Sequence, residues 1–266
     1  MTIKQRLKTV VPPFVLRIYH RVLRMLLDFR NAKKTPKEVF SEIYRRGDWG
    51  GPPGVFCSGI GSSADFIVKP YVANLIAYLR TYGPKKPRVV DLGCGDYRVG
   101  GHFAEYCSEY VGIDIVPDLI RHLQSSITQD HVKFLCLDMI EDELPAGDVC
   151  LVRQVFQHLS NEQISKVLVK LRQYKVIFIT EHYPSERASI IPNLNKVHGG
   201  GIRLSENSGV YLDKAPFNIP AATLELFLEV PANDLDADPD PGVIRTHIWR
   251  PSGIAGDPAL SAQNSQ

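Results

Sequence analysis

The sequence has 266 residues, of which 44% are apolar and 23% are charged, which is typical of one globular domain with appendages. This composition excludes a disordered or fibrous chain. The formal net charge of +2 gives the molecule as a whole no pull toward nucleic acid or toward another strongly charged partner.

Residues 1–37 form a basic arm with a net charge of +9, which leaves −7 on the rest of the chain. Between residues 14 and 30 apolar side chains recur at helical spacing, opposite a stripe that holds Arg17, Arg21 and Arg24. The pattern predicts a basic amphipathic helix. Such a helix can lie on an anionic bilayer, cover the core of the domain, or pair with a second copy of the chain.

The cellular location is predicted from the same arm and from the cysteines. Arginines interrupt the N-terminal apolar stretch and no small-residue cleavage site follows it, so it is not a secretory signal. No segment has the roughly 20 uncharged residues that a bilayer span needs. Five cysteines without C-x-x-C spacing favour reduced, mostly buried thiols over disulfides or a zinc site. We expect a cytoplasmic protein, with peripheral contact at the inner membrane face as one role for residues 14–30.

Residues 38–84 are predicted to form a region of helices with a glycine-rich lid. A short helix is expected at Pro36–Arg46 and a longer one at Val68–Tyr82, which Gly83-Pro84 would end. Between them Gly47–Ser63 reads as a loop rich in glycine. These elements precede the main domain, which we expect at residues 85–250.

Strand and helix patterns alternate from residue 85 to residue 180. Apolar, β-branched runs predict strands at Arg88–Leu92, Tyr110–Asp114, Val132–Leu137, Asp148–Val152 and Val176–Thr180, and helical patterns lie between them at Val99–Cys107, Pro117–Ser125 and Asn161–Arg172. Short apolar strands that alternate with helices predict a parallel sheet covered on both faces. The fold class is therefore α/β, with a doubly wound sheet.

The alternation ends after residue 180. Residues 181–222 are rich in polar residues, proline and glycine and have no clear period, and a segment of this kind inside a domain is usually functional, so we expect it to form part of a binding site. Two strands, Leu224–Val230 and Val243–Trp249, are joined by an acidic turn and predict an antiparallel hairpin at the sheet edge. Residues 251–266 are small and polar and read as a disordered tail.

A glycine motif follows the first predicted strand of the sheet. Asp91 lies at the end of that strand, and Gly93 and Gly95 come directly after it. Glycines at these positions let the backbone turn sharply and approach a ligand more closely than a Cβ would allow. A dinucleotide loop would have a third glycine where Arg98 stands, and no Gly-Lys-Ser/Thr sequence supplies a phosphate loop.

Acids also follow the next two strands. Asp114 can accept two hydrogen bonds from a ribose diol, and Asp138 can accept one from an adenine amine, while Ile115 and Met139 offer apolar contact to the ring. Asp91 would lie beside the amino group of the ligand or support the loop. Three acids at successive strand ends predict a cationic adenosine ligand without phosphate. Each acid has a simpler interpretation, as a helix or turn cap.

The motifs V-V-D-L-G-C-G-D, Y-V-G-I-D, F-L-C-L-D-M and D-V-C-L-V-R-Q-V-F-Q-H-L occur in this order between residues 88 and 160. With them the chain resembles the class I S-adenosylmethionine-dependent methyltransferases over about a third of its length. The resemblance implies S-adenosylmethionine as the cofactor and a Rossmann-like, seven-stranded, mostly parallel sheet with an antiparallel C-terminal hairpin. It assigns the cofactor loop to Asp91, Gly93 and Gly95, the ribose to Asp114, the adenine to Asp138 and Met139, and the methionine portion to Gln154.

A narrower resemblance, to bacterial methyltransferases of unassigned substrate, covers Ser58–Ser63 and Lys214–Pro220. In the first of these segments Gly61 and Ser62 would fold over the cofactor carboxylate with their backbone N–H groups. A plain flexible linker is the alternative. The resemblance names no substrate.

Three histidines are candidates for the general base. His158 follows the fourth strand, His182 ends the fifth, and His198 lies in a glycine-rich stretch that could close over the pocket. Structural or substrate-orienting roles remain open for all three. With Glu181 they could bind a metal ion, but no spacing requires it, and we expect no metal.

The leading functional hypothesis is methyl transfer to an oxygen of a small-molecule or saccharide-type acceptor. The polar side chains of residues 181–222 suit a ligand rich in hydroxyl groups. No nucleic-acid partner is expected, because Arg153-Gln154-Val155-Phe156 is not the N/D-P-P-Y type. A protein or nucleic-acid methyltransferase and a non-catalytic cofactor-binding protein are the rival interpretations, and the oligomeric state is left open.

Overall fold

The computed structural model describes residues 22, 25–52, 54–185, 189–232 and 241–252. Residues 14–21 and 23–24 of the expected amphipathic helix lie outside the described residues, as do most of the acidic turn and residues 253–266 of the tail. Residues 25–31 are helical and so agree with the last part of the expected helix.

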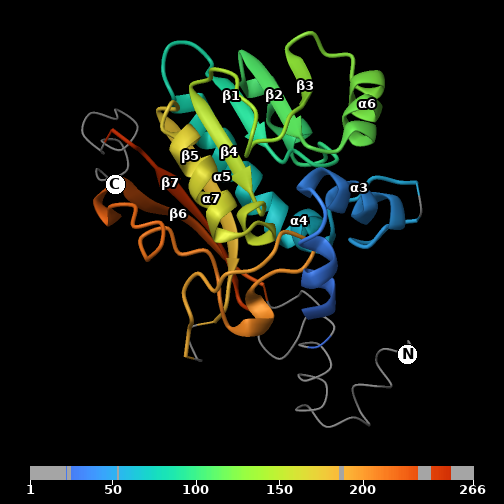
Figure 1. The fold of residues 1–266 in the computed structure, drawn as a ribbon. Helices are drawn as coiled ribbons and strands as arrows, with labels where there is room; N and C mark the ends of the chain where they lie inside the picture. Colours follow the sequence, from blue (N-terminus) through green and yellow to red (C-terminus); the bar gives the residue numbers. More distant parts are fainter. Residues whose placement is uncertain (1–21, 23–24, 53, 186–188, 233–240, 253–266) are drawn as a thin grey trace.

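Seven strands form one sheet in the order β3-β2-β1-β4-β5-β7-β6 (Figure 1). The parallel strands are β1 (Arg88–Leu92), β2 (Glu109–Asp114), β3 (Val132–Cys136), β4 (Val149–Arg153) and β5 (Val176–Tyr183), and the antiparallel ones are β6 (Leu224–Pro231) and β7 (Val243–Trp249). The predicted α/β fold with its C-terminal hairpin is confirmed. Within the hairpin β7 pairs with β5, so that β6 takes the edge.

Burial explains which strands are easiest to predict from the sequence. β1, β2, β4 and β5 are buried along almost their whole length, because helices cover both faces of the sheet, and their sequences are nearly continuous apolar runs. β3 and β6 lie at the two edges and keep exposed positions. The chain leaves β1 toward β2 and later returns beside it as β4, which places the point where the strand order reverses between β1 and β4.

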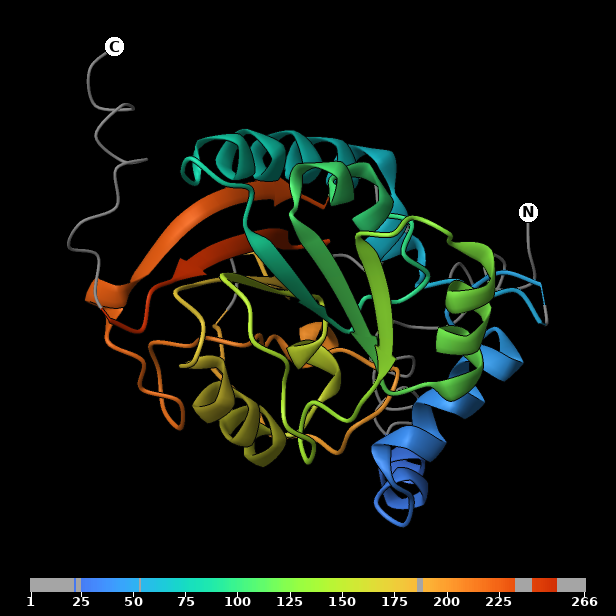
Figure 2. The same cartoon turned by 90° about the horizontal axis from the view of Figure 1, so that it is seen from above.

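The helices lie on both sides of this sheet. The main ones are α3 (Pro36–Arg46), α5 (Asp65–Thr81), α6 (Pro117–Ser126) and α7 (Asn161–Leu171), and α4 (Ile60–Ser63) is a single turn. Figure 2 shows α5 on one face and α7 on the opposite face, with α6 beside β2 and β3. The region of residues 38–84 is thus divided: α5 covers the sheet, and only the part before it is free to act as a lid.

Local signals set the ends of α3 and α7. Thr35 and Glu38 form a capping box at the start of α3, and Gly47 ends it in the left-handed conformation at φ 68°. Ser160 and Gln163 form a second capping box at the start of α7. These pairs satisfy backbone N–H groups that the first turn of a helix leaves free.

The helix predicted at Val99–Cys107 was wrong. The segment forms two short 3-10 turns, Gly100–His102 and Ala104–Tyr106. Gly100 packs so tightly that a Cβ there would lie 2.5 Å from the hydroxyl of Tyr110. Two adjacent glycines favour a helix poorly, and the turns instead bring the backbone close to β2.

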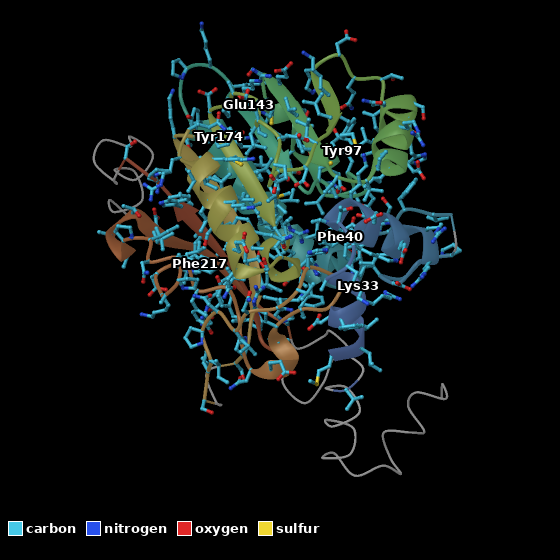
Figure 3. The ribbon with its side chains drawn as sticks, in the orientation of Figure 1. Lys33, Phe40, Tyr97, Glu143, Tyr174 and Phe217 are labelled. Carbon is cyan, nitrogen blue, oxygen red and sulfur yellow. The ribbon has the colours of Figure 1, made fainter. Side chains whose placement is uncertain are left out.

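The N-terminal segment lies at the lower end of the central strands in Figure 1. Asn31 is 6% exposed and donates from Nδ2 to the carbonyl of His198, which anchors the segment to the domain. Phe40 lies between α3 and the domain, whereas Lys33 stands on the outer part of the segment (Figure 3). The helical residues 25–31 therefore lead directly into α3, which packs at the edge of the sheet.

All five cysteines are free. Cys107 and Cys150 are buried, Cys57 and Cys94 are half-buried, and Cys136 is exposed. Among the described residues no helix has the length and apolar character that crossing a membrane requires.

Candidate active site

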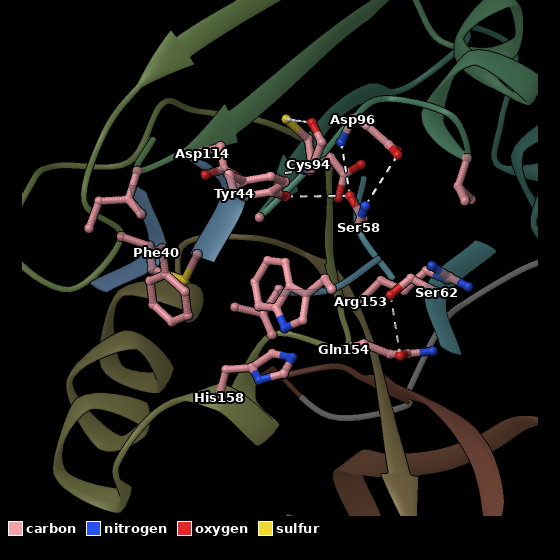
Figure 4. A pocket seen from close by; sticks show the side chains of 18 of the residues that line it. Phe40, Tyr44, Ser58, Ser62, Cys94, Asp96, Asp114, Arg153, Gln154 and His158 are labelled. Atoms are coloured by element: carbon pink, nitrogen blue, oxygen red, sulfur yellow. Dashed lines mark hydrogen bonds between the residues drawn. The ribbon is translucent and has the colours of Figure 1, made fainter. Parts of the chain in front are cut away.

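A cavity opens at the carboxyl edge of the parallel strands (Figure 4). The residues that follow β1, β2, β3 and β4 form its floor and sides, and residues between 36 and 63 cover it. This is the crevice in which open α/β sheets bind ligands, next to the point where the strand order reverses.

The glycine loop after β1 lines the cavity and has no room for side chains. Gly93 has φ 74° and Gly95 has φ 56°, a conformation that L residues rarely adopt. A Cβ on Gly93 would lie 2.5 Å from Val155 Cγ2, and one on Gly95 would collide with Ser58 Oγ. The loop thus leaves bare backbone facing the cavity.

Asp91 and Asp114 are both buried at the loop. Asp91 accepts a 2.6 Å hydrogen bond from the hydroxyl of Tyr110, and Asp114 accepts from the backbone N–H groups of Gly95 and Val116. Burial raises the pKa of each carboxyl group to about 6, although these hydrogen bonds act in the opposite direction. Both are therefore poised to change charge close to neutral pH.

Asp138 and Met139 follow β3 and line the same cavity, as does Ile115 after β2. One carboxylate oxygen of Asp138 accepts from the N–H of Ile140 at 2.8 Å, so this residue caps a turn. The second oxygen of Asp138 is left for another partner. The apolar side chains of Ile115 and Met139 line the cavity together with Asp114 and Asp138.

Two sets of hydrogen bonds fasten the N-terminal cover to the sheet edge. The Ser58 N–H donates to the Asp96 carboxylate at 3.3 Å, and the Asp96 N–H donates to Ser58 Oγ at 3.1 Å. Gln154 Nε2 donates to the carbonyl of Gly61 at 2.9 Å, and Ser62 Oγ lies 3.5 Å from Gln154 Oε1. These bonds hold Ser58, Gly61 and Ser62 against the residues that follow β1 and β4.

Gln154 is itself held in an uncommon conformation. Its φ is 57°, in the left-handed region, and its N–H donates to the carbonyl of Thr180 at 2.6 Å. A non-glycine residue in this region costs about 1–3 kcal/mol and occurs mostly at functional sites. The conformation directs the Gln154 side chain toward the lid.

Aromatic side chains form one wall of the cavity. The Trp49 ring lies 5.2 Å from the ring of His158 and 5.2 Å from that of Tyr44, and Phe40 lies 6.1 Å from Trp49. Phe40 and Tyr44 are four residues apart on α3 and so share one face of that helix. The rings are inclined to one another, at 35° for Phe40 and Trp49 and 85° for Tyr44 and Trp49, and they form a mostly apolar wall that holds one imidazole.

His158 lines the cavity, with its ring fixed from behind. Its Nδ1 lies 3.2 Å from the carbonyl of Gly199, which only accepts, so Nδ1 carries the hydrogen and Nε2, which lies 3.4 Å from the Gln157 amide nitrogen, is the acceptor. Burial, together with the nearby Lys196 ammonium, lowers the pKa of His158 to about 3. At neutral pH the ring is uncharged, and it resists taking up a proton.

The other two candidate bases lie outside the cavity, which corrects the expected grouping of three histidines. His182 Nε2 lies 2.6 Å from the carbonyl of Pro241, on the side of β5 that faces the hairpin. His198 bridges Gln163 Nε2 and the carbonyl of Lys34. Successive residues of a strand point to opposite faces of the sheet. Because the Glu181 side chain points toward the loop after β4, the His182 side chain points away from that loop.

The segment 181–222 was expected to bind the acceptor, but none of its described residues lines the cavity. Its polar side chains bind backbone groups of the segment itself or, as with Lys196 and Arg203, of the loop after β4. The Asn193 amide donates to the carbonyls of Tyr211 and Ala215, and its oxygen accepts from the Tyr211 N–H. Sequence composition does not distinguish these internal hydrogen bonds from contacts with a ligand.

Two buried charged residues hold the loop after β4. Glu181 is completely buried and accepts from the N–H groups of Phe156 and Gln157 at 2.8 and 2.9 Å. Arg203 is 1% exposed and donates to the carbonyls of Phe156 and Leu159. Burial raises the pKa of Glu181 to about 8. Both residues position the loop without reaching the cavity.

Sequence reasoning missed several residues that line the cavity, among them Tyr44, Trp49, Ser58 and Arg153. The recurrence of Phe40 and Tyr44 on one face of a predicted helix was a signal, but the same pattern is typical of core packing. No group of three or more possible metal ligands occurs among the described residues.

Residues 89–174 match a family model described as a methyltransferase domain. Among solved structures, the chain is similar to 1,6-didemethyltoxoflavin-N1-methyltransferase of Burkholderia thailandensis, with bound 1,6-didemethyltoxoflavin and S-adenosylhomocysteine. The TM-score is 0.53 at 15% identity, over 80% of this chain and 86% of the other.

Two further structures have a comparable likeness. Magnesium protoporphyrin IX methyltransferase (ChlM) of Synechocystis PCC 6803, with bound S-adenosylmethionine, gives a TM-score of 0.51 at 12% identity, over 82% of this chain and 97% of the other. The complex of DhpI with S-adenosylhomocysteine gives 0.50 at 12% identity, over 80% and 96%. At these identities the likeness shows a shared fold. No protein with curated annotation matches the sequence significantly.

Proposed function

Because residues 89–174 form a methyltransferase domain of the class I, S-adenosylmethionine-dependent type, we propose that the protein transfers a methyl group to an oxygen atom of a small-molecule acceptor. The observation that carries the proposal is the cavity, where bare glycine backbone, the buried Asp114 carboxylate and an aromatic wall meet under one lid. The cofactor end and the acceptor end of the reaction can both be assigned to residues of this one cavity.

The residues present fit S-adenosylmethionine. Gly93 and Gly95 line the cavity with backbone alone, and Asp114 offers a carboxylate at the strand end beside them. We assign cofactor binding to Asp91, Gly93, Gly95, Asp114, Ile115, Asp138, Met139 and Gln154, with Gly61 and Ser62 in the lid. When bound, the cofactor supplies an electrophilic methyl group, so the chain has to hold an acceptor oxygen in line and release its proton.

His158 is assigned to orient the acceptor hydroxyl. Its Nε2 can accept a hydrogen bond from a hydroxyl group in place of the Gln157 amide nitrogen, which lies 3.4 Å away, and the carbonyl of Gly199 fixes the tautomer. A pKa of about 3 makes the ring a poor holder of a proton at pH 7, so the proton passes on to water. His182 and His198 do not line the cavity, and their ring nitrogens lie against the carbonyls of Pro241 and Lys34.

A saccharide-type acceptor is the finer form of the proposal. Trp49 and Phe40 offer flat apolar faces, while His158 and the Ser62 hydroxyl offer hydrogen bonds. A ring with an apolar face and hydroxyl groups at its edge needs this combination. The support for a saccharide-type acceptor comes from Phe40, Trp49, Ser62 and His158, because none of the described residues of 181–222 lines the cavity.

We further propose that the N-terminal arm docks on an anionic bilayer. Met25, Leu26 and Phe29 are 64–66% exposed and Val22 is 50% exposed, with the Lys33 ammonium 4.2 Å from the centroid of the Phe29 ring. Ten basic residues within the first 37 complement an anionic lipid surface. Since the arm continues into α3, which covers the cavity, docking would bring the cavity close to acceptors at the membrane.

The activity test uses the purified full chain and S-adenosylmethionine with a carbon-13 methyl group, incubated with small-molecule and glycan extracts. We expect labelled methyl on an oxygen of a small molecule, detected by mass spectrometry and NMR. His158→Gln should lower kcat about 10- to 100-fold, and kcat of the variant should not gain a pH dependence near pH 6.5. The control is His102→Gln, at an exposed histidine. Label found only on protein or RNA would contradict the proposal.

A further inference from the structure

Arg153 ends β4 and lines the cavity, yet its side chain lacks the partners that a buried guanidinium requires. Its Nε and Nη2 atoms are buried and have no hydrogen-bond partner among the described residues. Buried arginine nitrogens are nearly always paired, because desolvating them without a partner is costly. The missing partner is therefore expected to come from outside the chain.

The surroundings of Arg153 hold its side chain in place without satisfying it. The ring of Tyr71 lies beneath the guanidinium, with Cζ 5.1 Å from the ring centroid. The Asp91 carboxylate acts electrostatically on Arg153, but it accepts a hydrogen bond from Tyr110, and no ion pair joins it to Arg153 in the described part of the chain. The guanidinium is thus positioned in the cavity with its nitrogen fork free.

The position of Arg153 in the cavity indicates which part of a ligand it meets. Figure 4 shows Arg153 beside Ser62 and Gln154, on the opposite side of the cavity from Asp114. The nucleoside end of the cofactor is assigned to the Asp114 side, with Ile115 and Met139. The amino-acid end then lies toward Arg153, and that end carries a carboxylate.

We infer that Arg153 is the binding site for the carboxylate of the amino-acid portion of the cofactor. The inference rests on the proposed function and adds a residue to it. A guanidinium with free Nε and Nη2 presents parallel N–H groups, which is the arrangement that binds a carboxylate in two hydrogen bonds. Lysine offers a single point charge at this place and would bind less well.

The test compares two probes by calorimetry on the full chain. S-Adenosylhomocysteine contains the amino-acid carboxylate, whereas 5′-methylthioadenosine has the same nucleoside without it. We expect Arg153→Met to weaken binding of S-adenosylhomocysteine at least about tenfold and to leave binding of 5′-methylthioadenosine unchanged. Arg153→Lys should fall between the wild type and Arg153→Met.

Arg172→Met is the matched control, because Arg172 also lies over an aromatic ring, that of Trp249, but outside the cavity. Its affinities should equal those of the wild type, and circular dichroism should show native folding for each variant. Equal loss of both probes in Arg153→Met would make Arg153 structural and overturn the inference. Unchanged affinities with a raised KM for the acceptor would assign the carboxylate to the acceptor and also overturn it. A wild type that binds neither probe would instead remove the proposed function.

Discussion

Asp114 shows how one side chain can combine a structural and a binding role. Its oxygens accept from Gly95 and Val116, which ties the glycine loop to the end of β2. Each oxygen keeps a second lone pair, so hydrogen bonds from a ribose can be added without breaking the first ones. The choice between a cap and a ligand-binding residue that the sequence left open is therefore not exclusive.

We predict that Asp114→Ala weakens binding of S-adenosylhomocysteine by about 1–3 kcal/mol, or roughly 10- to 100-fold, because it removes a charged acceptor. Calorimetry measures the change. Asp118→Ala, at an exposed acid in the first turn of α6, is the control. Equal affinities in the two variants would show that Asp114 only supports the loop.

The same site should respond to pH in a defined direction. Asp91 and Asp114 have a pKa of about 6 in the unliganded protein, so both are mostly ionised at pH 7.5 and mostly protonated at pH 5. Ligand affinity should therefore fall as the pH falls through 6, and Asp114→Asn should flatten part of this dependence. A constant affinity from pH 5 to pH 7.5 would be inconsistent with carboxylate recognition.

The helices and turns differ in how far their structure is determined by residues close in the sequence. α3 begins and ends where its capping box and Gly47 predict, since these signals act within a few residues. The segment 99–107 has a helical apolar pattern, but contact with Tyr110 and two glycines produce 3-10 turns. Contacts from a distant strand outweighed the local pattern.

The N-terminal helical segment leads to a prediction about membranes. We expect the protein to sediment with vesicles that contain phosphatidylglycerol, and much less with pure phosphatidylcholine or at high salt, because basic side chains and exposed apolar ones act together. Met25→Glu/Phe29→Glu should reduce the bound fraction several-fold, whereas Val169→Glu, at an exposed apolar residue of α7, should not. A wild type that stays in the supernatant would contradict docking, and a dimer that the double substitution dissociates would identify a second copy as the partner.

The folded molecule as a whole carries a buried acid whose charge depends on pH. Burial raises the pKa of Glu181 from 4.5 to about 8, although two backbone N–H groups favour its ionised form. Between these two values the folded state binds a proton that the unfolded state has released. Stability that is fully present below pH 4.5 is therefore lost as the pH rises through 8.

We predict that the free energy of unfolding falls by about 1 kcal/mol between pH 7 and pH 8 from Glu181 alone, because the full slope of about 1.4 kcal/mol per pH unit holds only well below its pKa. Asp91 and Asp114 titrate lower, and the lowered pKa values of His158 and His198 act below 6.5. The raised pKa values of the buried thiols of Cys107 and Cys150 add a fall in the same direction as the pH approaches 8, so the comparison with Glu181→Gln gives the part that belongs to Glu181. Urea unfolding at a series of pH values measures the slope. Glu181→Gln should flatten it and the exposed Glu162→Gln should not; equal slopes in both would refute the assignment.

The sequence alone was sufficient for the sheet, for its helices apart from the one expected at Val99–Cys107, and for the residues that meet at the cofactor side of the cavity. Strand periods, capping pairs and glycines are local signals, and in a doubly wound sheet the residues that follow parallel strands must meet at one edge. Asp91, Gly93, Gly95, Asp114 and Asp138 could therefore be grouped before any coordinates were known. Their individual roles toward the cofactor remain predictions.

The acceptor side required the tertiary structure. Which histidine faces the cavity depends on the face of the sheet to which each strand residue points and on the path of residues 181–222. Only the fold shows that polar side chains of this segment, such as Asn193, bind backbone groups of the same segment. Trp49 and Tyr44, which line the cavity, come from the N-terminal part of the chain. The free nitrogens of Arg153 are also visible only there, because pairing is a matter of distances between side chains far apart in sequence. Local patterns reflect the chain's own neighbours, whereas a binding site consists of groups that long-range packing brings together.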